Sequence, residues 1–571
     1  MFGRIISIVM SVIMSFTGMT LSGFNGIVDT VSEILYGLPV TAQAVKADFF
    51  SDLSLLDFTK INSKTAFVNN KIAVFVSDKT DFDEKRSAFK EIGGTVVGWS
   101  APVDLYVVQY ALPMSYEKIL EKCEDIAELD AVELAIPVLA HKSIQNGTPN
   151  DSFDPDPDKT IVWDEKNPAG RNWWLEAINA RQAWDYSKYF STVNIGVVDG
   201  GFDTSHEELA GKISFPTFLH KMCNIPDLHG THVSGIIAAK HNNEVGIAGV
   251  CENSNLICVD WAPFLINIWN TELAIFFGLS NCVKAGAKVV NFSLGTSGSK
   301  YGNEMTLYDE VIVPAAISYM MSSLLSKGYD FVVCQSAGNG DIDGDAIDSR
   351  MNGHFCNLNK DNLYTGSYEI AAEEILERVL VVGSVKNSGG GKFVQSDFSN
   401  VGPQIDISAP GEEVYSSVLG DEYESIDGTS MATPIVTGVA GLVWSVNPSL
   451  KGTEVKEILC ESTDSVAKIN KEHNYYFYDY LEFCEYPVVD AKAAVEEAIR
   501  RSEKNIGTVK GTLSKSAESI EYDGVSHTVF SDGTFSFVAP AGSGTAKVKN
   551  ASGSIIDSFN ITVQAGKTVT V

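Results

Sequence analysis

Five apolar segments in the middle of the chain constrain its fold more than any other feature. Several of them are apolar almost throughout, and stretches with helical periodicity separate them. They cover residues 193–198, 255–259, 288–292, 331–334 and 379–382. A strand that is apolar on both faces needs cover on both faces, and helices on each side of a parallel sheet provide it. The sequence therefore predicts an α/β domain whose mainly parallel sheet is flanked by helices.

Units of different composition lie on both sides of this domain. Residues 71–138 follow the order strand, helix, strand, strand, helix, strand, which predicts a small α+β unit. Residues 146–158 are rich in Pro, Asp and Gly, and because they cannot bury apolar surface, we expect an exposed linker. From residue 506 onward, apolar and polar residues alternate along short segments that Gly residues separate, which predicts a small all-β sandwich.

The N-terminus has the features of an export signal. Arg4 precedes an apolar run, and the segment 42–44, Ala-Gln-Ala, has the small-x-small form of a signal peptidase site. We therefore expect a secreted or extracellular protein. Because Asp29 and Glu33 interrupt the segment, an uncleaved membrane anchor with Arg4 inside is the alternative, and a cell-surface location would follow from it.

Charge and cysteine content argue against a nucleic acid partner and against a zinc site. Lys plus Arg number 42 against 73 Asp plus Glu, which gives a formal net charge of −31. Such a chain repels phosphates, so we expect no nucleic acid partner. The nine Cys residues form no CxxC pair and no Cys/His cluster with zinc spacing. Cys460 and Cys484 remain a candidate disulfide.

Three segments each place a reactive polar side chain at the edge of the predicted sheet. Asp199 ends an apolar strand before a Gly-Gly turn, His229 opens a helical stretch, and Ser430 lies at the start of another. Each has an ordinary explanation when taken alone. Asp199 is typical of a turn, His229 could pair with His232 on a metal, and Ser430 could be a helix N-cap.

Together, in the order Asp, His, Ser, these segments resemble the three active-site signatures of the subtilase family of serine peptidases. The match is close over residues 229–235 and 428–434. The resemblance implies that Ser430 is the nucleophile, that His229 is the general base and acid, and that Asp199 orients His229. Asn339, in the segment 335–340, is then the oxyanion donor together with the Ser430 backbone N–H.

The resemblance also implies how a substrate is held. The segment Ser293, Leu294 and Gly295 resembles the strand that pairs with substrate backbone in this family. Protein or peptide substrates would then bind as extended strands. No cofactor is expected for catalysis.

A structural calcium site is a further expectation from the family. Residues 242–247 resemble its calcium loop, with the Asn243 side chain and the carbonyls of Val245 and Ile247 as ligands. Glu208 falls where another carboxylate ligand is expected. The family more often has Asp there, so a plain surface turn is the alternative.

Resemblance and composition together divide the chain. We expect a signal peptide or anchor, a pro-domain that acts as folding aid and inhibitor, a linker with the mature N-terminal segment, a catalytic domain and a β-sandwich module. In chain order, these five parts cover residues 1–44, 45–142, 143–171, 172–503 and 504–571. Autolysis is predicted near residues 140–142, and the protein is expected to be a monomer.

Other functions remain open at this level. A catalytically inactive relative would bind peptides or a surface, an adhesin would act through its C-terminal module, and a maturation protease would serve one substrate. The acidic loop of Asp341, Asp343, Asp345 and Asp348 would favour basic residues at the cut, or it is a solvated loop.

Overall fold

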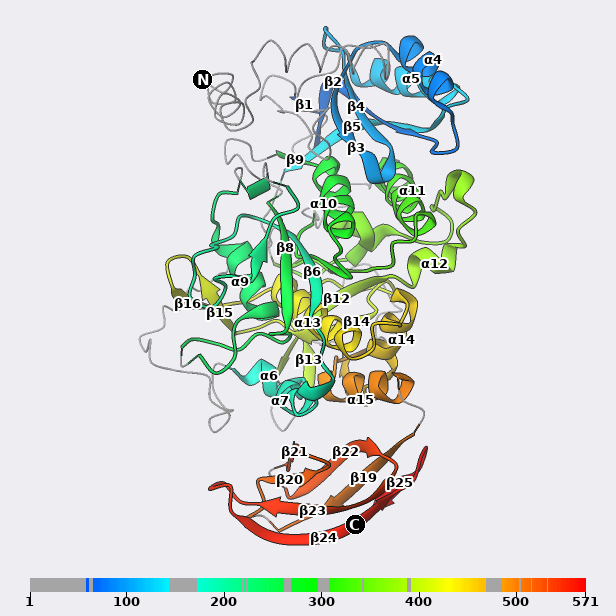
Figure 1. Cartoon of the computed structure of the whole chain (residues 1–571). Coiled ribbons are helices and arrows are strands. Elements are labelled where there is room, and N and C mark those ends of the chain that lie inside the picture. The colour runs from blue at the N-terminus through cyan, green and yellow to red at the C-terminus, as the bar shows by residue number, and fades with distance from the viewer. Residues whose placement is uncertain are drawn as a thin grey trace, which may run out of the picture.

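Three structured units follow one another along the chain (Figure 1). The computed structural model describes residues 58–60, 65–142, 172–217, 220–221, 224–243, 245–260, 269–295, 308–340, 344–387, 392–468, 485–502, 505–514, 516–530 and 532–571. The predicted signal segment, the whole predicted linker, Asp341, Asp343 and Cys484 lie outside these residues.

A parallel sheet forms the centre of the middle unit, as the apolar segments predict. Its five central strands are β8 (Ser254–Asp260), β6 (Val193–Asp199), β10 (Val289–Phe292), β11 (Val332–Ser336) and β12 (Val379–Asn387), in that spatial order. All four pairings between them are parallel. β14 (Ile407–Pro410) also pairs with β12 in parallel.

Helices cover both faces of this sheet, which explains why its strands are apolar throughout. α10 (Glu272–Lys284) and α11 (Val313–Ser326) share one hydrophobic cluster with Val198 of β6 and Val290 of β10. α9 (Leu228–Ala238) and α13 (Thr429–Val446) share a second cluster with Val197 and Val289. Alternate residues of each strand therefore enter opposite cores.

The remaining elements of the middle unit are short or peripheral. The helices are α6 (Trp173–Ala177), α7 (Ala180–Trp184), α12 (Ala372–Leu376), α14 (Gly452–Glu461) and α15 (Ala491–Ser502). The strands are β7 (Ile213–Ser214), β9 (Trp269–Thr271), β13 (Phe393–Gln395), β15 (Val414–Val418), β16 (Glu422–Ile426), β17 (Val466–Lys468) and β18 (Glu485–Pro487). Within the described residues, α13 alone has the length and hydropathy of a membrane span, and it is entirely buried in this unit.

The N-terminal unit is an α+β sandwich that rests on α10 and α11. Its elements are β1 (Phe58–Lys60), β2 (Thr65–Val76), α4 (Phe82–Ile92), β3 (Thr95–Ser100), β4 (Leu105–Gln109), α5 (Tyr116–Ala127) and β5 (Val132–Lys142). The Phe75 ring lies 5.8 Å from the ring of Phe276 on α10 and 5.5 Å from that of Tyr319 on α11. β5 also pairs with β9 of the middle unit, so one sheet crosses from the first unit to the second.

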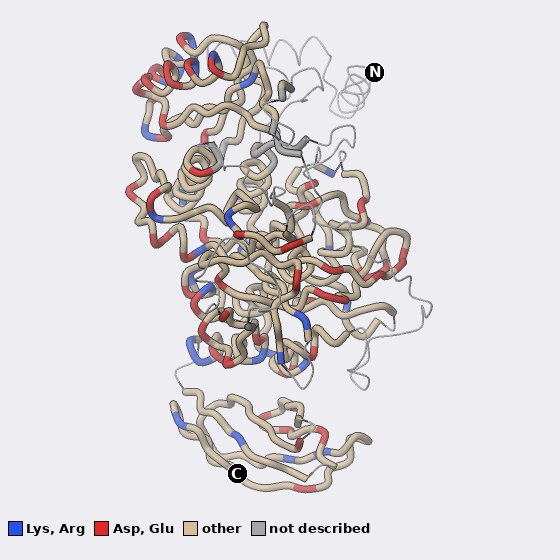
Figure 2. Tube along the Cα trace, turned by 180° about the vertical axis from the view of Figure 1, so that it is seen from behind, with Lys and Arg blue, Asp and Glu red and all other residues tan. Residues whose placement is uncertain are grey.

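The C-terminal unit consists of two small sheets packed against the opposite side of the middle unit, and all their pairings are antiparallel except that of β19 with β25. Its strands are β19 (Ile506–Thr512), β20 (Ser519–Tyr522), β21 (Val525–Thr528), β22 (Thr534–Pro540), β23 (Gly542–Lys549), β24 (Ile555–Val563) and β25 (Thr568–Thr570). One sheet has the order β22-β19-β25 and the other β21-β20-β23-β24. Acidic and basic residues are spread over all three units (Figure 2).

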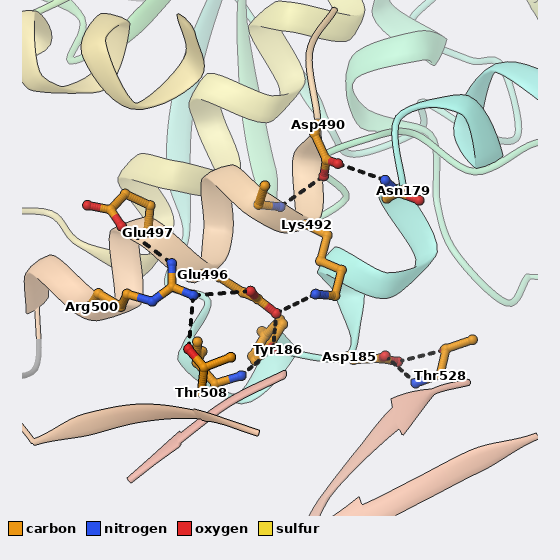
Figure 3. Close-up of polar contacts among 12 residues, drawn as sticks. Asn179, Asp185, Tyr186, Asp490, Lys492, Glu496, Glu497, Arg500, Thr508 and Thr528 are labelled. Carbon is orange, nitrogen blue, oxygen red and sulfur yellow. Dashed lines mark hydrogen bonds and ion pairs between the residues drawn. The ribbon is translucent and has the colours of Figure 1, made fainter. Parts of the chain in front are cut away.

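Tyr186 organises the contact between the middle unit and this module (Figure 3). Its side chain is 1% exposed, and its hydroxyl donates to Glu496 Oε1 at 2.6 Å and accepts from the Val538 N–H at 3.0 Å. Beside it, the Asp185 carboxylate accepts from the Thr528 N–H at 2.7 Å. Burial raises the pKa of Tyr186 well above its usual value, so the phenol stays a donor. The module is therefore docked by buried hydrogen bonds and by shared apolar packing.

The imidazole of His527 predicts that this contact weakens in acid. It lies 5.3 Å from the Tyr186 ring and stacks on Phe537 at 4.1 Å, and burial, with Lys492 and Lys188 nearby, lowers its pKa to about 3. An unfolded His binds a proton below pH about 6.5, whereas the folded His527 does not, so stability falls as the pH drops from about 6.5 toward 3. His527→Phe should remove about 2.5 kcal/mol of the destabilisation expected between pH about 7 and about 4.5.

Denaturant unfolding of the Ser430→Ala chain, with and without His527→Phe, at pH about 7 and about 4.5, measures this difference. His232, whose pKa is also about 3, is present in both proteins, so its contribution cancels. An equal loss of stability in both proteins on acidification would contradict the assignment.

Candidate active site

Asp199 and His229 meet at the carboxyl end of the central sheet. Asp199 is the last residue of β6, and His229 is the second residue of α9, which Asp227 caps by accepting from the His229 N–H at 2.9 Å. His229 Nδ1 lies 2.6 Å from Asp199 Oδ1, and the Gly200 N–H donates to the same oxygen at 2.7 Å. A carboxylate at Nδ1 favours the tautomer that leaves Nε2 as the acceptor.

Close packing of α9 against the end of β6 makes this contact possible. A side chain at Gly230 would collide with the Gly200 carbonyl, so only glycine fits at that helix position. Asp199 is 1% exposed, and this burial raises its pKa, while the hydrogen bonds from His229 and Gly200 act in the opposite direction. The imidazole is thus the main partner of a buried carboxylate.

Ser430 lies at the same edge of the sheet. It is the second residue of α13, and its hydroxyl donates to the Ser293 carbonyl at 3.3 Å, while Ser293 Oγ donates to the Ser430 carbonyl at 2.8 Å. Ser293 follows Phe292 of β10, which is paired with Val198 of β6. Asp199 and Ser293 therefore follow paired residues on neighbouring strands, and Ser430 is hydrogen-bonded beside them.

The chain changes direction at this point of the sheet. From β6 it continues through α9 to β8 on one side, and from β8 it returns through α10 to β10 on the other side. α9 and α10 belong to the two opposite hydrophobic clusters. Such a switch point opens a crevice at the carboxyl ends of the strands, where ligands bind in α/β proteins.

Asn339 follows β11 and is fixed against the start of α13. Its Oδ1 accepts from the Thr429 N–H at 2.8 Å and from Thr429 Oγ1 at 2.7 Å. Because both bonds use the oxygen, the amide nitrogen is turned away from Thr429 and is the donor of this side chain. Sequence reasoning missed the role of Thr429, which also accepts from the Gly338 N–H at 3.2 Å.

His232 ties α9 to the hairpin β15–β16. Its Nε2 lies 3.1 Å from the Glu424 carbonyl, and Ser416 Oγ donates to the His232 carbonyl at 2.8 Å. The imidazole is fully buried, and this burial lowers its pKa to about 3. The described residues contain no group of three or more His, Cys, Asp or Glu that could hold a metal ion. His232 therefore joins α9 to the hairpin, and the described residues give no support to a metal site that includes both His229 and His232.

The segment from Ser293 to Gly295 continues β10 past the end of the sheet pairing. The Leu294 carbonyl accepts from Gln335 Nε2 and from Ser336 Oγ, so it is directed toward β11. The preceding Ser293 carbonyl is directed toward Ser430 instead. Successive carbonyls thus point to opposite sides, as in a strand.

The four residues of the expected calcium site come together but do not fit a cation as they are arranged. Glu208 accepts from Asn243 Nδ2 at 2.8 Å, from the Ile247 N–H at 2.8 Å and from the Tyr423 hydroxyl at 3.3 Å. Asn243 Oδ1 accepts from the Val245 N–H at 3.3 Å. Calcium needs oxygen ligands, whereas three donors face this carboxylate. Burial raises the pKa of Glu208 to about 7, and these hydrogen bonds act in the opposite direction.

Comparison with known proteins agrees with this architecture. The model of the subtilase family matches residues 191–478. A thermophilic serine proteinase of Bacillus sp. (strain AK1) is 27% identical over 412 residues, which are 71% of this chain and 85% of that protein. Thermitase of Thermoactinomyces vulgaris is 31% identical over 281 residues, which are 48% of this chain and 83% of thermitase.

A solved structure has the same fold over most of the chain. The crystal structure of fervidolysin from Fervidobacterium pennivorans covers 92% of this chain and 81% of its own, with a TM-score of 0.52 and 18% identity. This likeness supports the fold class predicted from the sequence.

The Glu208 contacts predict stability that does not depend on calcium at this position. Asn243→Ala removes a hydrogen bond to a buried carboxylate and should cost about 2 kcal/mol of unfolding free energy. In the Ser430→Ala chain, the loss should be equal with calcium and with a chelator. Asn255→Ala, an exposed asparagine on β8, is the control and should change little. A loss confined to calcium-containing buffer would reverse this interpretation of the site.

Proposed function

Because the chain belongs to the subtilase family and is a serine-type endopeptidase, we propose that it cleaves proteins through Asp199, His229 and Ser430 as an exported, self-processed enzyme. The contact of 2.6 Å between His229 Nδ1 and Asp199 Oδ1, beside the hydrogen-bonded Ser430, carries this proposal. A buried carboxylate, an imidazole and a hydroxyl at one sheet edge are the parts that acyl transfer requires.

In the first half of the reaction, Ser430 Oγ attacks the scissile carbonyl carbon while His229 Nε2 takes the hydroxyl proton. Asp199 holds the imidazole in the required tautomer and stabilises the imidazolium. His229 then gives the proton to the leaving amine, and the acyl group stays on Ser430. Water, deprotonated by His229, releases the acid in the second half. Catalytic hydrogen bonds often tighten only with substrate in place, so the present Ser430 bond to Ser293 is compatible with this role.

The tetrahedral intermediate needs donors for its oxyanion, and we assign them to Asn339 Nδ2 and the Ser430 backbone N–H. At the start of α13 the Thr429 N–H donates to the Asn339 oxygen and the Met431 N–H to the Gly428 carbonyl, so among the described residues the Ser430 N–H is the donor left for an oxyanion. Loss of one such donor typically costs about 3 kcal/mol of transition-state stabilisation.

A protein substrate would run along residues 293–295 as an added strand. The alternation of carbonyls in this segment supports such pairing, because it leaves the Ser293 carbonyl on the side of Ser430. Ser293 would then exchange its bond with the Ser430 hydroxyl for one with substrate backbone.

The N-terminal unit is proposed as a pro-domain that inhibits the enzyme until it is removed. Its support is the pairing of β5 with β9, with Ala140 opposite Thr271 and Lys142 opposite Trp269. Phe75 and the hydrogen bond from Lys327 Nζ to the Pro102 carbonyl at 2.6 Å also join the two units. Because β5 runs to Lys142, we place the cut at or just beyond this residue.

Export to the cell exterior belongs to the same proposal. It rests on the N-terminal apolar run after Arg4 and on the Ala-Gln-Ala segment, both outside the described residues. A monomer acting on extracellular protein fits a net charge of −31, which favours solubility.

Expression of the full chain and of its Ser430→Ala variant tests the proposal. The parent chain should lose its N-terminal unit near Lys142 and should be labelled by a serine-directed phosphonate, because both events need the Ser430 nucleophile. The variant should keep its full mass after any signal cleavage and should take no label. Equal processing in both chains, or a label on the variant, would refute the assignment of Ser430.

A further inference from the structure

We propose that Asn400 is a positioning residue that fixes the loop carrying Asn339 and so aims the oxyanion donor. The inference deepens the proposed function, on which it rests. Asn400 lies between β13 and β14, far from Asn339 in sequence, and only 2% of its surface is exposed. Within the described part of the chain, its side chain bonds to the loop around Asn339.

Hydrogen bonds from Asn400 hold the backbone on both sides of Asn339. Its Nδ2 donates to the Ala337 carbonyl at 2.9 Å, and its backbone N–H donates to the Gly338 carbonyl at 2.9 Å. Its Oδ1 accepts from the Gly340 N–H at 3.0 Å. The residues directly before and after Asn339 are therefore bonded to one asparagine.

The loop needs such restraint because of its two glycines. Gly338 has φ +98° and Gly340 has φ +80°, in the region that glycine adopts easily and that leaves many alternatives open to a free chain. A Cβ at Gly338 would collide with the Asn400 amide, so the side chain is packed directly against the loop. Without this packing and its hydrogen bonds, the Asn339 backbone gains freedom to turn.

Asparagine is the side chain that this position requires. The Ala337 carbonyl needs one donor. The N–H groups of Gly340 and Ile347 need one oxygen that accepts from both, and the bond from Ile347 is 3.1 Å long. An amide supplies both, whereas an ionised Asp supplies no donor. An Ala would leave a buried carbonyl and two partly buried N–H groups without this partner.

Asn400 is itself held by residues that lie outside α13. Gln395 Nε2 donates to the Asn400 carbonyl at 3.2 Å, and the Val401 N–H donates to the Ile347 carbonyl at 2.9 Å. Asn339 is thus fixed from two directions. Thr429 on α13 holds its amide oxygen, and Asn400 holds the backbone of the residues on either side of it.

A positioning role predicts a specific kinetic pattern. An oxyanion donor acts on the transition state, so its misdirection should lower kcat and leave KM nearly unchanged. We expect Asn400→Ala and Asn400→Asp to lower kcat by about tenfold to a hundredfold, with KM within about twofold. Affinity for a peptide boronate, which forms a tetrahedral adduct, should fall by about the same factor as kcat/KM.

The closing experiment is a double-mutant cycle between Asn400 and Asn339 in the full chain. Variants that do not process themselves are matured by tagged parent enzyme, which is then removed. Once Asn339→Ala has removed the donor, adding Asn400→Ala should lower kcat by less than about twofold, because no amide is left to aim. The milder Asn400→Ser variant serves if Asn400→Ala does not fold.

Asn447→Ala is the matched control. Asn447 is also a buried asparagine, 5% exposed, that accepts from the Ser449 N–H, but it follows the far end of α13, roughly 25 Å from Ser430. It should lower the unfolding temperature without changing kcat. The inference would be overturned if the two substitutions lowered kcat by factors that simply multiply in the double variant. It would also be overturned if Asn400→Ala lowered stability and left kcat unchanged. If the parent chain neither hydrolyses peptides nor takes a phosphonate label, the proposed function fails instead.

Discussion

The hydrogen bond between His229 and Asp199 is the interaction on which the site depends. It forms because β6 ends in a carboxylate at the switch point of a parallel sheet and because α9 begins close to that end. Glycine at position 230 permits the approach. The contact orients the imidazole and at the same time supplies the buried carboxylate with its main partner. Structure and proposed chemistry therefore rest on the same few atoms.

Two further connections bring the other groups to this edge. Ser293, at the end of β10, exchanges hydrogen bonds with Ser430, so the start of α13 is fixed beside β6 and β10. Thr429 then joins α13 to Asn339 beyond β11. Three neighbouring parallel strands thus lead to Asp199, Ser293 and Asn339, which we propose as the acid, the substrate segment and the oxyanion donor. The helices α9 and α13 start with the proposed base and the proposed nucleophile. The outer units pack on opposite faces of this body, the N-terminal one through α10 and α11 and the C-terminal one through Tyr186.

Much of the fold was predictable from local patterns. Apolar segments buried on both faces indicate a parallel sheet, and the observed strands β6, β8, β10, β11 and β12 overlap the five predicted segments. The subtilase resemblance pointed to Asp199, His229 and Ser430, which the fold gathers at one edge. Contacts between distant segments were not predictable. Sequence does not say whether a loop turns N–H groups or carbonyls toward Glu208, which is why the calcium expectation did not fit. It also carries no sign that Asn400 faces the Asn339 loop.

The dependence of kcat/KM on pH tests the central assignment most directly, because the reaction requires an imidazole that can accept the Ser430 proton. A protonated His229 cannot act as a base, so kcat/KM should fall about tenfold per pH unit on the acid side of one titration. Asp199→Asn should leave the fold intact and lower kcat by about four orders of magnitude, because the imidazole loses its oriented tautomer. A flat profile between pH about 5 and 9, or an Asp199→Asn variant of undiminished kcat, would contradict the account.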